Sequence, residues 1–409
     1  MENKYSNIQN TKANIDDSID WQNLQFSHPE RTVRLATSFS GIGAIEHSFH
    51  RLGIKYQIQF AGDIDANCKK AYFANYPIED NNWHDDVHSL DAKPYKGKVD
   101  LFVGGAPCQA FSLRGKHGGF EDTRGTLFRE FARVVIECQP KVFIFENVKG
   151  MLSHDKGRTW KVIKETFEKD CGYDVYFQVL NAKDYGIPQS RERIYCIGFK
   201  NETEFKYPAP IKLDKTVYDF LQNRFDKKYL LKQKGVHFIT RAINYQKSYT
   251  QVNGNIILCQ KRNQQFNWHG DFVYHPDSEL TPTNEAFDEF IFDVRDVEEK
   301  YYLSDKVAKY VLAGGTKNFK TSTKTDLDIA RPLLQSMHKM HRAGVDNYVT
   351  FKGRIRKLTP RECHRLMGFK DSYKIVVCDT SAYQQAGNSI VVDVLIALLK
   401  QMDITQYGV

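Results

Sequence analysis

Cysteine is sparse in this chain, and its pattern excludes several kinds of protein. The 409 residues contain eight cysteines, which are too few for a disulfide scaffold, so we expect a reducing compartment. No Cys-x-x-Cys pair occurs, and the spacing of the cysteines matches no zinc site. We therefore predict neither disulfides nor a bound metal.

Long apolar runs are also missing. The polar stretch 1–30 lacks the hydrophobic segment of a signal peptide. The longest apolar run, 390–399, is interrupted by Asp393 and is too short to cross a bilayer. These absences predict a soluble cytoplasmic protein.

The chain does carry positive charge and enough apolar residues for ordinary cores. Its net charge is +8 and 41% of its residues are hydrophobic. The charge is compatible with an anionic partner such as nucleic acid, although basic enzymes that bind no nucleic acid share it. The length allows one large domain and a smaller one.

Apolar runs alternate with helical patterns over the first 200 residues, which is typical of an α/β fold with a doubly wound, mostly parallel sheet. Strands are expected at 33–36, 57–61, 99–103 and 142–145, and helices at 44–52, 66–75, 126–137 and 158–169. The alternation stops near residue 200, and order returns after 345 with a helix at 360–367. We predict a polar leader (1–30), a catalytic and cofactor-binding domain (31–200 with 346–409) and a smaller loop-rich domain (201–345).

Polar features follow the last apolar residue of four different predicted strands. They are the Gly41-x-Gly43 turn, Asp63, Cys108 and Glu146. If these strands are parallel, all four features lie at one edge of the sheet, where ligands bind in open α/β folds.

The first of these features predicts a nucleotide-like cofactor. A Gly-x-Gly turn between a strand and a helix lets the backbone approach a ligand, and a carboxylate about 20 residues later binds ribose hydroxyls. Gly41, Gly43 and Asp63 fit this pattern, but Glu46 stands where a dinucleotide fingerprint needs glycine. A nicotinamide cofactor is therefore disfavoured, whereas S-adenosylmethionine, which has no pyrophosphate, needs no third glycine.

Cys108 and Glu146 together suggest covalent chemistry on cytosine. A cysteine alone is more often a small buried hydrophobe, and a carboxylate at a strand end is more often an ordinary surface group. Thiolate addition at C6 of cytosine makes C5 nucleophilic, and it needs an acid positioned near N3. Arg191 and Arg193 would supply positive charge that lowers the pKa of the thiol.

The ordered motifs resemble those of the cytosine-C5 DNA methyltransferases of bacterial restriction-modification systems. The resemblance covers the chain in family order, apart from the leader and the middle module. It rests on Phe39-Ser40-Gly41-Ile42-Gly43, Gly105-Ala106-Pro107-Cys108-Gln109, Arg124-Gly125-Thr126-Leu127-Phe128, Glu146-Asn147-Val148, Gln189-Ser190-Arg191-Glu192-Arg193, Arg356-Lys357-Leu358-Thr359-Pro360-Arg361-Glu362 and Gly387-Asn388-Ser389-Ile390-Val391.

This resemblance implies roles for individual residues. Cys108 would be the nucleophile in a loop shared with Gln109, Glu146 the acid at N3, and Arg193 the residue that orients Glu146 and contacts the base. The expected S-adenosylmethionine site consists of Phe39, Gly41, Ile42, Gly43, Asp63, Ile64, Asp86, Pro107, Leu127, Asn388 and Ile390.

The resemblance also implies that the substrate is duplex DNA, read by a target-recognition domain at 201–345. Reaching C6 requires the cytosine to be flipped out of the duplex, and we expect the glycine-rich loop 112–119 to close over it. The expected DNA contacts are Ser112, Arg114, Arg262, Gln264, Gln265, Arg354 and Arg356. We expect a monomer that shares its recognition sequence, but no stable contact, with a cognate restriction endonuclease.

Three alternatives remain open. The substrate would be RNA in the tRNA-methylating branch of the family, which usually carries a Cys-Phe-Thr signature that this chain lacks. A catalytically inactive DNA-binding module is disfavoured by the presence of Cys108, Glu146 and Arg193, and a nicotinamide oxidoreductase by Glu46. The DNA sequence that is recognised cannot be derived from these patterns.

Overall fold

The computed structural model divides the chain into two compact units. Unit 1 comprises Met1–Asn181, Glu192–Ile211 and Val392–Val409, and unit 2 comprises Ala182–Arg191 and Lys212–Val391. The structure describes residues 15–106, 126–220, 222, 250–252, 270–272, 301–312, 315–316, 319–320, 324–338, 341, 346–351 and 354–409.

These units do not follow the predicted domain limits. Residues 346–391 group with unit 2, although we predicted them in the cofactor-binding domain, and 201–211 group with unit 1. The predicted domains are assignments of function, and they stay a prediction.

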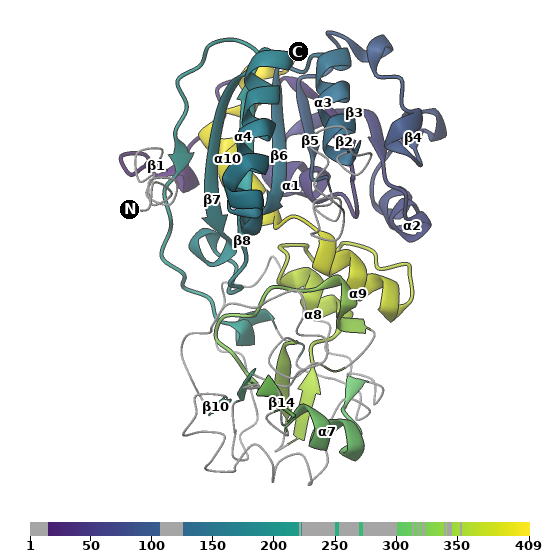
Figure 1. Cartoon of the computed structure of the whole chain (residues 1–409), viewed down its shortest axis with the longest axis vertical. Coiled ribbons are helices and arrows are strands. Elements are labelled where there is room, and N and C mark those ends of the chain that lie inside the picture. The colour runs from purple at the N-terminus through teal and green to yellow at the C-terminus, as the bar shows by residue number, and fades with distance from the viewer. Residues whose placement is uncertain are drawn as a thin grey trace. The chain divides into compact units, whose positions relative to one another are not determined.

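Unit 1 is built on a seven-stranded sheet (Figure 1). Its order is β4 (Trp83–His84), β3 (Lys55–Gly62), β2 (Thr32–Ser38), β5 (Leu101–Gly104), β6 (Val142–Val148), β8 (Glu192–Phe199) and β7 (Asp174–Asn181). All neighbouring strands are parallel except β8, which runs antiparallel to both β6 and β7. The predicted doubly wound, mostly parallel sheet is confirmed.

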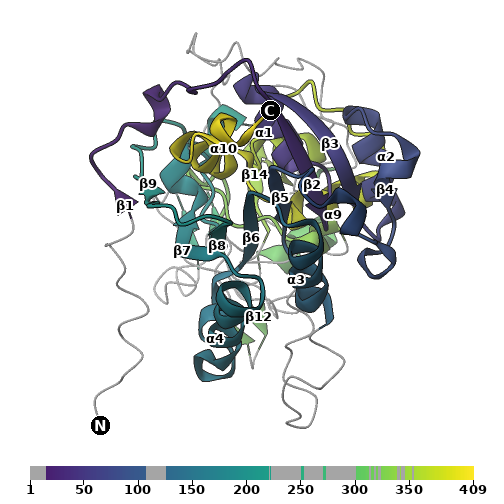
Figure 2. The same cartoon turned by 90° about the horizontal axis from the view of Figure 1, so that it is seen from above.

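Helices cover both faces of this sheet. Figure 2 shows α1 (Ala44–Leu52) and α10 (Val392–Gln401) on one face, and α3 (Thr126–Cys138) and α4 (Arg158–Glu165) on the other. The bounds of α1 and of α2 (Ala66–Asn75) agree with the prediction. The helix predicted to reach residue 169 ends its α-helical part at Glu165, because the segment Thr166–Asp170 forms a π-helix.

The strand order creates a switch point between β2 and β5. The chain passes from β2 outward to β3 and β4, and then returns to β5 and continues to β6 on the other side. Ser38 and Gly104, the last residues of β2 and β5, are direct partners in the sheet. Because ligands bind at such switch points, the loops after β2 and β5 leave the sheet where a ligand site is expected.

The structure corrects the predicted end of β6. We expected this strand to stop at Phe145, with Glu146 in the following loop. Instead β8, which the sequence patterns did not predict, pairs with β6 as far as Val148, and Glu146 lies opposite Tyr195. Glu146 is therefore held inside a paired strand rather than on a loop.

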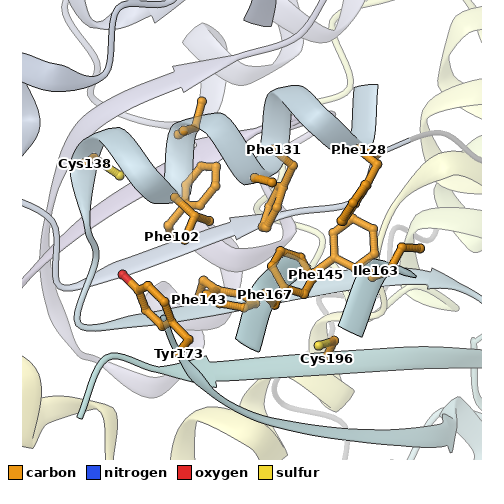
Figure 3. Packing of buried hydrophobic residues seen from close by; sticks show 14 of the residues in the cluster. Phe102, Phe128, Phe131, Cys138, Phe143, Phe145, Ile163, Phe167, Tyr173 and Cys196 are labelled. Atoms are coloured by element: carbon orange, nitrogen blue, oxygen red, sulfur yellow. The ribbon is translucent and has the colours of Figure 1, made fainter. Parts of the chain in front are cut away.

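An aromatic core supports the strands that lead to this edge. Phe102 of β5 stacks on Phe131 of α3 with ring centroids 4.7 Å apart. Phe143 of β6 packs on Phe167 at 4.6 Å, and Phe145 also contacts both Phe131 and Phe167 (Figure 3). These rings are fully buried, so the ends of β5 and β6 rest on close-packed side chains.

Unit 2 contains short elements. The helices are α7 (Asp305–Val311), α8 (Pro360–Arg365) and α9 (Asp379–Asn388), and a hairpin joins β14 (Tyr348–Phe351) to β15 (Arg354–Lys357). Thr359 and Glu362 form a capping box that starts α8, the helix predicted at 360–367. The other two-stranded pairs among the described residues are β1 (Ile15–Asp16) with β9 (Tyr207–Pro208), β10 (Thr250–Val252) with β11 (Gly270–Phe272), and β12 (Gly315–Thr316) with β13 (Phe319–Lys320).

Among the described residues, one helical stretch is long and apolar enough to cross a membrane by length and composition alone. It is the 23-residue stretch Asp379–Gln401, and its most apolar 18-residue segment is 72% buried inside the protein. It consists of α9 in unit 2 and α10 in unit 1, separated by residues 389–391. Such burial is typical of core helices.

Candidate active site

The loop after β2 is tied to the end of β3. The Gly41 N–H donates to Oδ2 of Asp63 at 2.9 Å, and the Ser40 N–H donates to the Gly62 carbonyl at 2.9 Å. Oδ1 of Asp63 accepts from the Asp65 N–H, and burial raises the pKa of the Asp63 carboxyl. The carboxylate is thus held in one orientation beside the glycine turn.

Gly43 can hardly be replaced in this turn. Its φ is +77°, which is in the left-handed region, and it is the N-cap residue of α1. A Cβ atom here would overlap the ring of Tyr76, whose hydroxyl donates to the Gly43 carbonyl at 2.8 Å. Tyr76 therefore packs directly against the turn and hydrogen-bonds to it.

We expect Gly43→Ala to lower the free energy of unfolding by about 2–4 kcal/mol. Left-handed strain contributes about 1–2 kcal/mol, and displacement of the Tyr76 ring adds about 1–2 kcal/mol. Gly41→Ala is the matched control, because Gly41 has a φ of +55° but no atom within 4 Å of its Cβ position. It should lose only the strain, about 1–2 kcal/mol. Urea denaturation without cofactor measures both, and equal losses would contradict the role given to Tyr76.

Glu146 and Arg193 form an ion pair across β6 and β8. Nε of Arg193 lies 3.2 Å from Oε1 of Glu146, and the two side chains are only 17% and 12% exposed. Arg193 is the sheet partner of Val148, two residues beyond Glu146, and it also donates to the Glu192 carbonyl at 2.8 Å. The antiparallel register therefore aims the guanidinium at the carboxylate.

Residues next to Glu146 hold the start of the loop after β5. Nδ2 of Asn147, which is 5% exposed, donates to the Ala106 carbonyl at 2.8 Å. A Cβ atom on Gly105 would lie 3.0 Å from the Glu146 carbonyl oxygen and 3.1 Å from Oε2. A side chain at position 105 would therefore require Glu146 to shift by a few tenths of an ångström.

These contacts place the Glu146 carboxylate, which Arg193 holds, beside Gly105 and Ala106. Cys108 follows two residues later in the sequence. The carboxylate and the two residues beside it lie at the carboxyl edge of the sheet, next to the turn after β2. A scan against family models supplies the identity: the model described as C-5 cytosine-specific DNA methylase matches residues 33–403. The chain belongs to this family.

Individual relatives agree with the family assignment. The Type II methyltransferase M1.ScrFI of Lactococcus lactis subsp. cremoris is 33% identical over 369 residues, which are 89% of this chain and 76% of the relative. The orphan methyltransferase M.SPRI of Bacillus phage SPR is 30% identical, over 90% of this chain and 97% of the relative. The expected resemblance to this family is confirmed, and the protein is a DNA methyltransferase.

A solved structure agrees on the fold alone. The Dnmt2 methyltransferase of S. pombe superposes with a TM-score of 0.58 over 90% of this chain and 98% of that chain, at 16% sequence identity.

The methyltransferase brings several predicted cofactor residues to the edge formed by β2, β3 and β4. Ile42 is buried, whereas Ile64 directly after Asp63 is 83% exposed. Asp86 lies two residues beyond β4, where the His88 N–H donates to its carboxylate and lowers the pKa of Asp86. Phe39 and Leu127 pack against the aromatic core.

Other predicted residues belong to unit 2. Arg191 is 3% exposed, and its guanidinium donates to the carbonyls of Leu333, Gly387 and Ser389. These bonds give Arg191 a structural role inside unit 2, and its predicted help to Cys108 stays a prediction. Asn388 is the last residue of α9, and Ile390 follows it. Their part in the cofactor site also stays a prediction.

Some predicted residues lie outside the described part of the chain. The backbones of Arg354 and Arg356 form part of β15, but their side chains are not described. The remaining positions are Pro107, Cys108, Gln109, Ser112, Arg114, Arg262, Gln264 and Gln265, together with the loop 112–119.

Sequence reasoning missed three residues that shape this edge. The sequence patterns assign no role to Tyr76, place Asn147 only within the Glu146-Asn147-Val148 motif, and give Glu46 significance only as evidence against a dinucleotide site. No local pattern could have found Tyr76, because its contact with Gly43 joins residues 33 positions apart. The position of Asn147 directly after Glu146 was a usable signal.

The residues at this edge fit the methyl donor that the family implies, S-adenosylmethionine. No atom lies within 4 Å of the Cβ position of the left-handed Gly41, which leaves room for a ligand to approach the backbone, and Asp63 has acceptor capacity for hydroxyl groups. The exposed Ile64 offers apolar surface beside that carboxylate. No group of three or more potential metal ligands occurs among the described residues.

Proposed function

We propose that this methyltransferase transfers a methyl group from S-adenosylmethionine to C5 of a flipped-out cytosine in a specific duplex DNA sequence. The observation that carries the proposal is the Glu146–Arg193 pair, placed beside the loop that leads to Cys108. The switch point between β2 and β5 puts this pair and the cofactor turn at the same edge of the sheet.

Cys108 is the proposed nucleophile. Its thiolate forms a bond to C6, and the electrons of the C5–C6 double bond then make C5 nucleophilic. S-adenosylmethionine supplies an electrophilic methyl group when bound. C5 would take this methyl group as its bond to the cofactor sulfur breaks, which leaves S-adenosylhomocysteine. Transfer of the C5 proton to water and departure of the Cys108 thiolate then restore the aromatic ring.

Glu146 and Arg193 act at the opposite side of the base. A carboxyl group at N3 offsets the negative charge that thiolate addition places on the ring, by donating or sharing a proton there. The Arg193 guanidinium holds the Glu146 carboxyl in one orientation, which removes the cost of reorganising it during the reaction. Gln109 follows the nucleophile in the same loop.

The cofactor would lie along the edge of β2, β3 and β4. Asp63 would accept hydrogen bonds from the ribose hydroxyls, Ile64 would cover the purine, and Asp86 would accept from the purine amino group. The other proposed cofactor contacts are Phe39, Gly41, Ile42, Gly43, Pro107, Leu127, Asn388 and Ile390.

The middle of the chain, 201–345, is the proposed target-recognition domain, and the protein would act as a monomer in the cytoplasm. The relatives include both a Type II and an orphan methyltransferase. We propose the restriction-modification setting, with a cognate endonuclease that acts on the same site without stable contact.

A labelled-methyl assay tests the substrate and the reaction. The purified chain is incubated with S-adenosylmethionine labelled in its methyl group, and either unmethylated duplex DNA or tRNA. We expect label in the DNA, recovered as 5-methylcytosine, and none in the tRNA. Label confined to tRNA, or recovered at another position of the base, would overturn the proposal.

A further inference from the structure

Glu46 is a buried acid for which the proposed reaction has no use. It lies in the first turn of α1 and has no exposed surface. Its Oε1 accepts from the hydroxyl of Tyr72 at 2.5 Å and from that of Thr37 at 3.4 Å, and its Oε2 has no hydrogen-bond partner among the residues that the structure describes. Burying a polar atom without a hydrogen-bond partner costs free energy of folding.

A chain of hydroxyl groups leads from Glu46 to the cofactor edge. Oγ1 of Thr37 lies 2.6 Å from Oγ of Ser40, and Oγ of Ser40 accepts from the Gly62 N–H at 2.9 Å. One consistent set of donors runs from the Gly62 N–H through Ser40 and Thr37 to Oε1 of Glu46. This relay, comprising Glu46, Thr37, Ser40 and Gly62, joins α1 to the ends of β2 and β3.

The relay ends beside Asp63, the proposed ribose contact, and Gly41, another proposed cofactor contact. Gly62 is followed by Asp63, and Ser40 is followed by Gly41, whose N–H donates to Asp63. The Ser40 N–H also donates to the Gly62 carbonyl, so Ser40 bonds to both backbone groups of Gly62. A change in the hydroxyl of Ser40 would therefore alter the spacing between the glycine turn and the carboxylate.

The surroundings of Glu46 keep its carboxyl neutral in mildly acidic solution. Burial raises the pKa of Glu46 to about 7, and the hydrogen bond from Tyr72 opposes this shift only in part. Tyr72 from α2 donates to the carboxyl, the carboxyl in turn raises the pKa of Tyr56 from β3, and neither tyrosine carries positive charge. No cation is among the causes of its shift.

We propose that Glu46 is a positioning residue for the cofactor site, which acts through Thr37 and Ser40 to hold Gly41 and Asp63 at the spacing that binds the ribose. This inference rests on the proposed function, because it assumes S-adenosylmethionine at this edge. It predicts that breaking the relay weakens cofactor binding and leaves the chemical step intact.

Thr37→Val breaks the relay with little change of shape. We expect the KM for S-adenosylmethionine to rise about tenfold, the effect of one lost hydrogen bond in a buried network, with kcat within about twofold of the unaltered protein. Hydrogen exchange without cofactor provides an independent measure. The Gly41 and Gly62 amides should exchange about tenfold faster in the variant.

Two substitutions of Glu46 separate its hydrogen bonds from its size. Glu46→Gln keeps an acceptor for Thr37 and Tyr72, so we expect a KM within about twofold of the unaltered protein. Glu46→Leu removes the acceptor and should match Thr37→Val in both KM and amide exchange. If Glu46→Leu does not fold, Thr37→Val and Glu46→Gln still decide the proposal.

Ser48→Ala is the matched control on the same helix. Ser48 is fully buried, and its hydroxyl donates to the Ala44 carbonyl at 2.8 Å, outside the relay. It should lose stability with no change in the KM for S-adenosylmethionine.

The proposal is overturned if Thr37→Val leaves both KM and amide exchange unchanged, or if Ser48→Ala raises KM as much. Failure of the proposed function can be told apart from failure of the relay proposal. In the first case the unaltered protein would transfer no methyl group to DNA, and amide exchange would still test the relay.

Discussion

Replacing Cys108 with serine is expected to lower methyl transfer by about 10⁴-fold or more, and to abolish the covalent adduct with DNA that contains 5-fluorocytosine. A serine hydroxyl is ionised far less than a thiol at neutral pH, so its attack on C6 is correspondingly rare. The fluorine at C5 cannot leave as a proton does, and it therefore traps the adduct after methyl transfer. Denaturing gel electrophoresis of protein incubated with the fluorinated duplex and S-adenosylmethionine measures the adduct.

Cys378→Ser is the matched control for this experiment. Cys378 is exposed and precedes α9 as its N-cap residue in unit 2. We expect this variant to form the adduct as the unaltered protein does, and Cys108→Ser to retain binding of unmodified DNA. An adduct that persists in Cys108→Ser would refute the nucleophile assignment.

Glu146→Gln is expected to lower the rate of methyl transfer by about 10²- to 10⁴-fold, the range found for loss of a positioned acid. Glutamine has the same shape, but it cannot donate an acidic proton at N3, and it loses the charge that pairs with Arg193 at 3.2 Å. The rate in a single turnover, at saturating S-adenosylmethionine and duplex DNA, reports this step separately from product release.

Glu192→Gln is the control for removal of a carboxylate from the same region. Glu192 starts β8 beside Arg193, but its side chain pairs with Lys149 at 3.0 Å and is 36% exposed. Exposed pairs of this kind contribute about 1 kcal/mol or less to stability, so the variant should stay folded. Because the Glu192 side chain pairs with Lys149 and not with Arg193, the rate of methyl transfer should change by no more than about twofold. A Glu146→Gln rate close to that of Glu192→Gln would show that Glu146 takes no part in the chemistry.

Local signals in the sequence were enough to predict α1 and α2, the helices that follow β2 and β3 at the proposed cofactor site. The helix α1 ends at Gly53, which adopts a left-handed conformation, and α2 begins after Asp65, whose side chain caps the Asn67 N–H at 2.8 Å. Both signals depend on residues within a few positions of the helix end. The bounds predicted for both helices agree with the structure, and Gly53 was the signal used for the end of α1.

Pairing between distant residues was not predictable in the same way. The sequence patterns did not indicate β7 and β8, and β6 was expected to stop at Phe145. The extension to Val148 comes from pairing with Arg193, 45 positions later in the chain. Since a strand's length depends on its neighbour as well as on its own residues, a single segment does not reveal it.

The sequence by itself determined the family, the α/β class and the order of the motifs, because each motif depends on adjacent residue types and on the alternation of strands with helices. The tertiary structure decided which polar groups act together. Register across β6 and β8 pairs Arg193 with Glu146, whereas Arg191, two residues away, bonds to carbonyls within unit 2. Packing of α1 against β2 and α2 surrounds Glu46 with Thr37 and Tyr72. Hydrogen bonds form between groups that folding brings within about 3 Å, and that distance is unrelated to their separation along the chain.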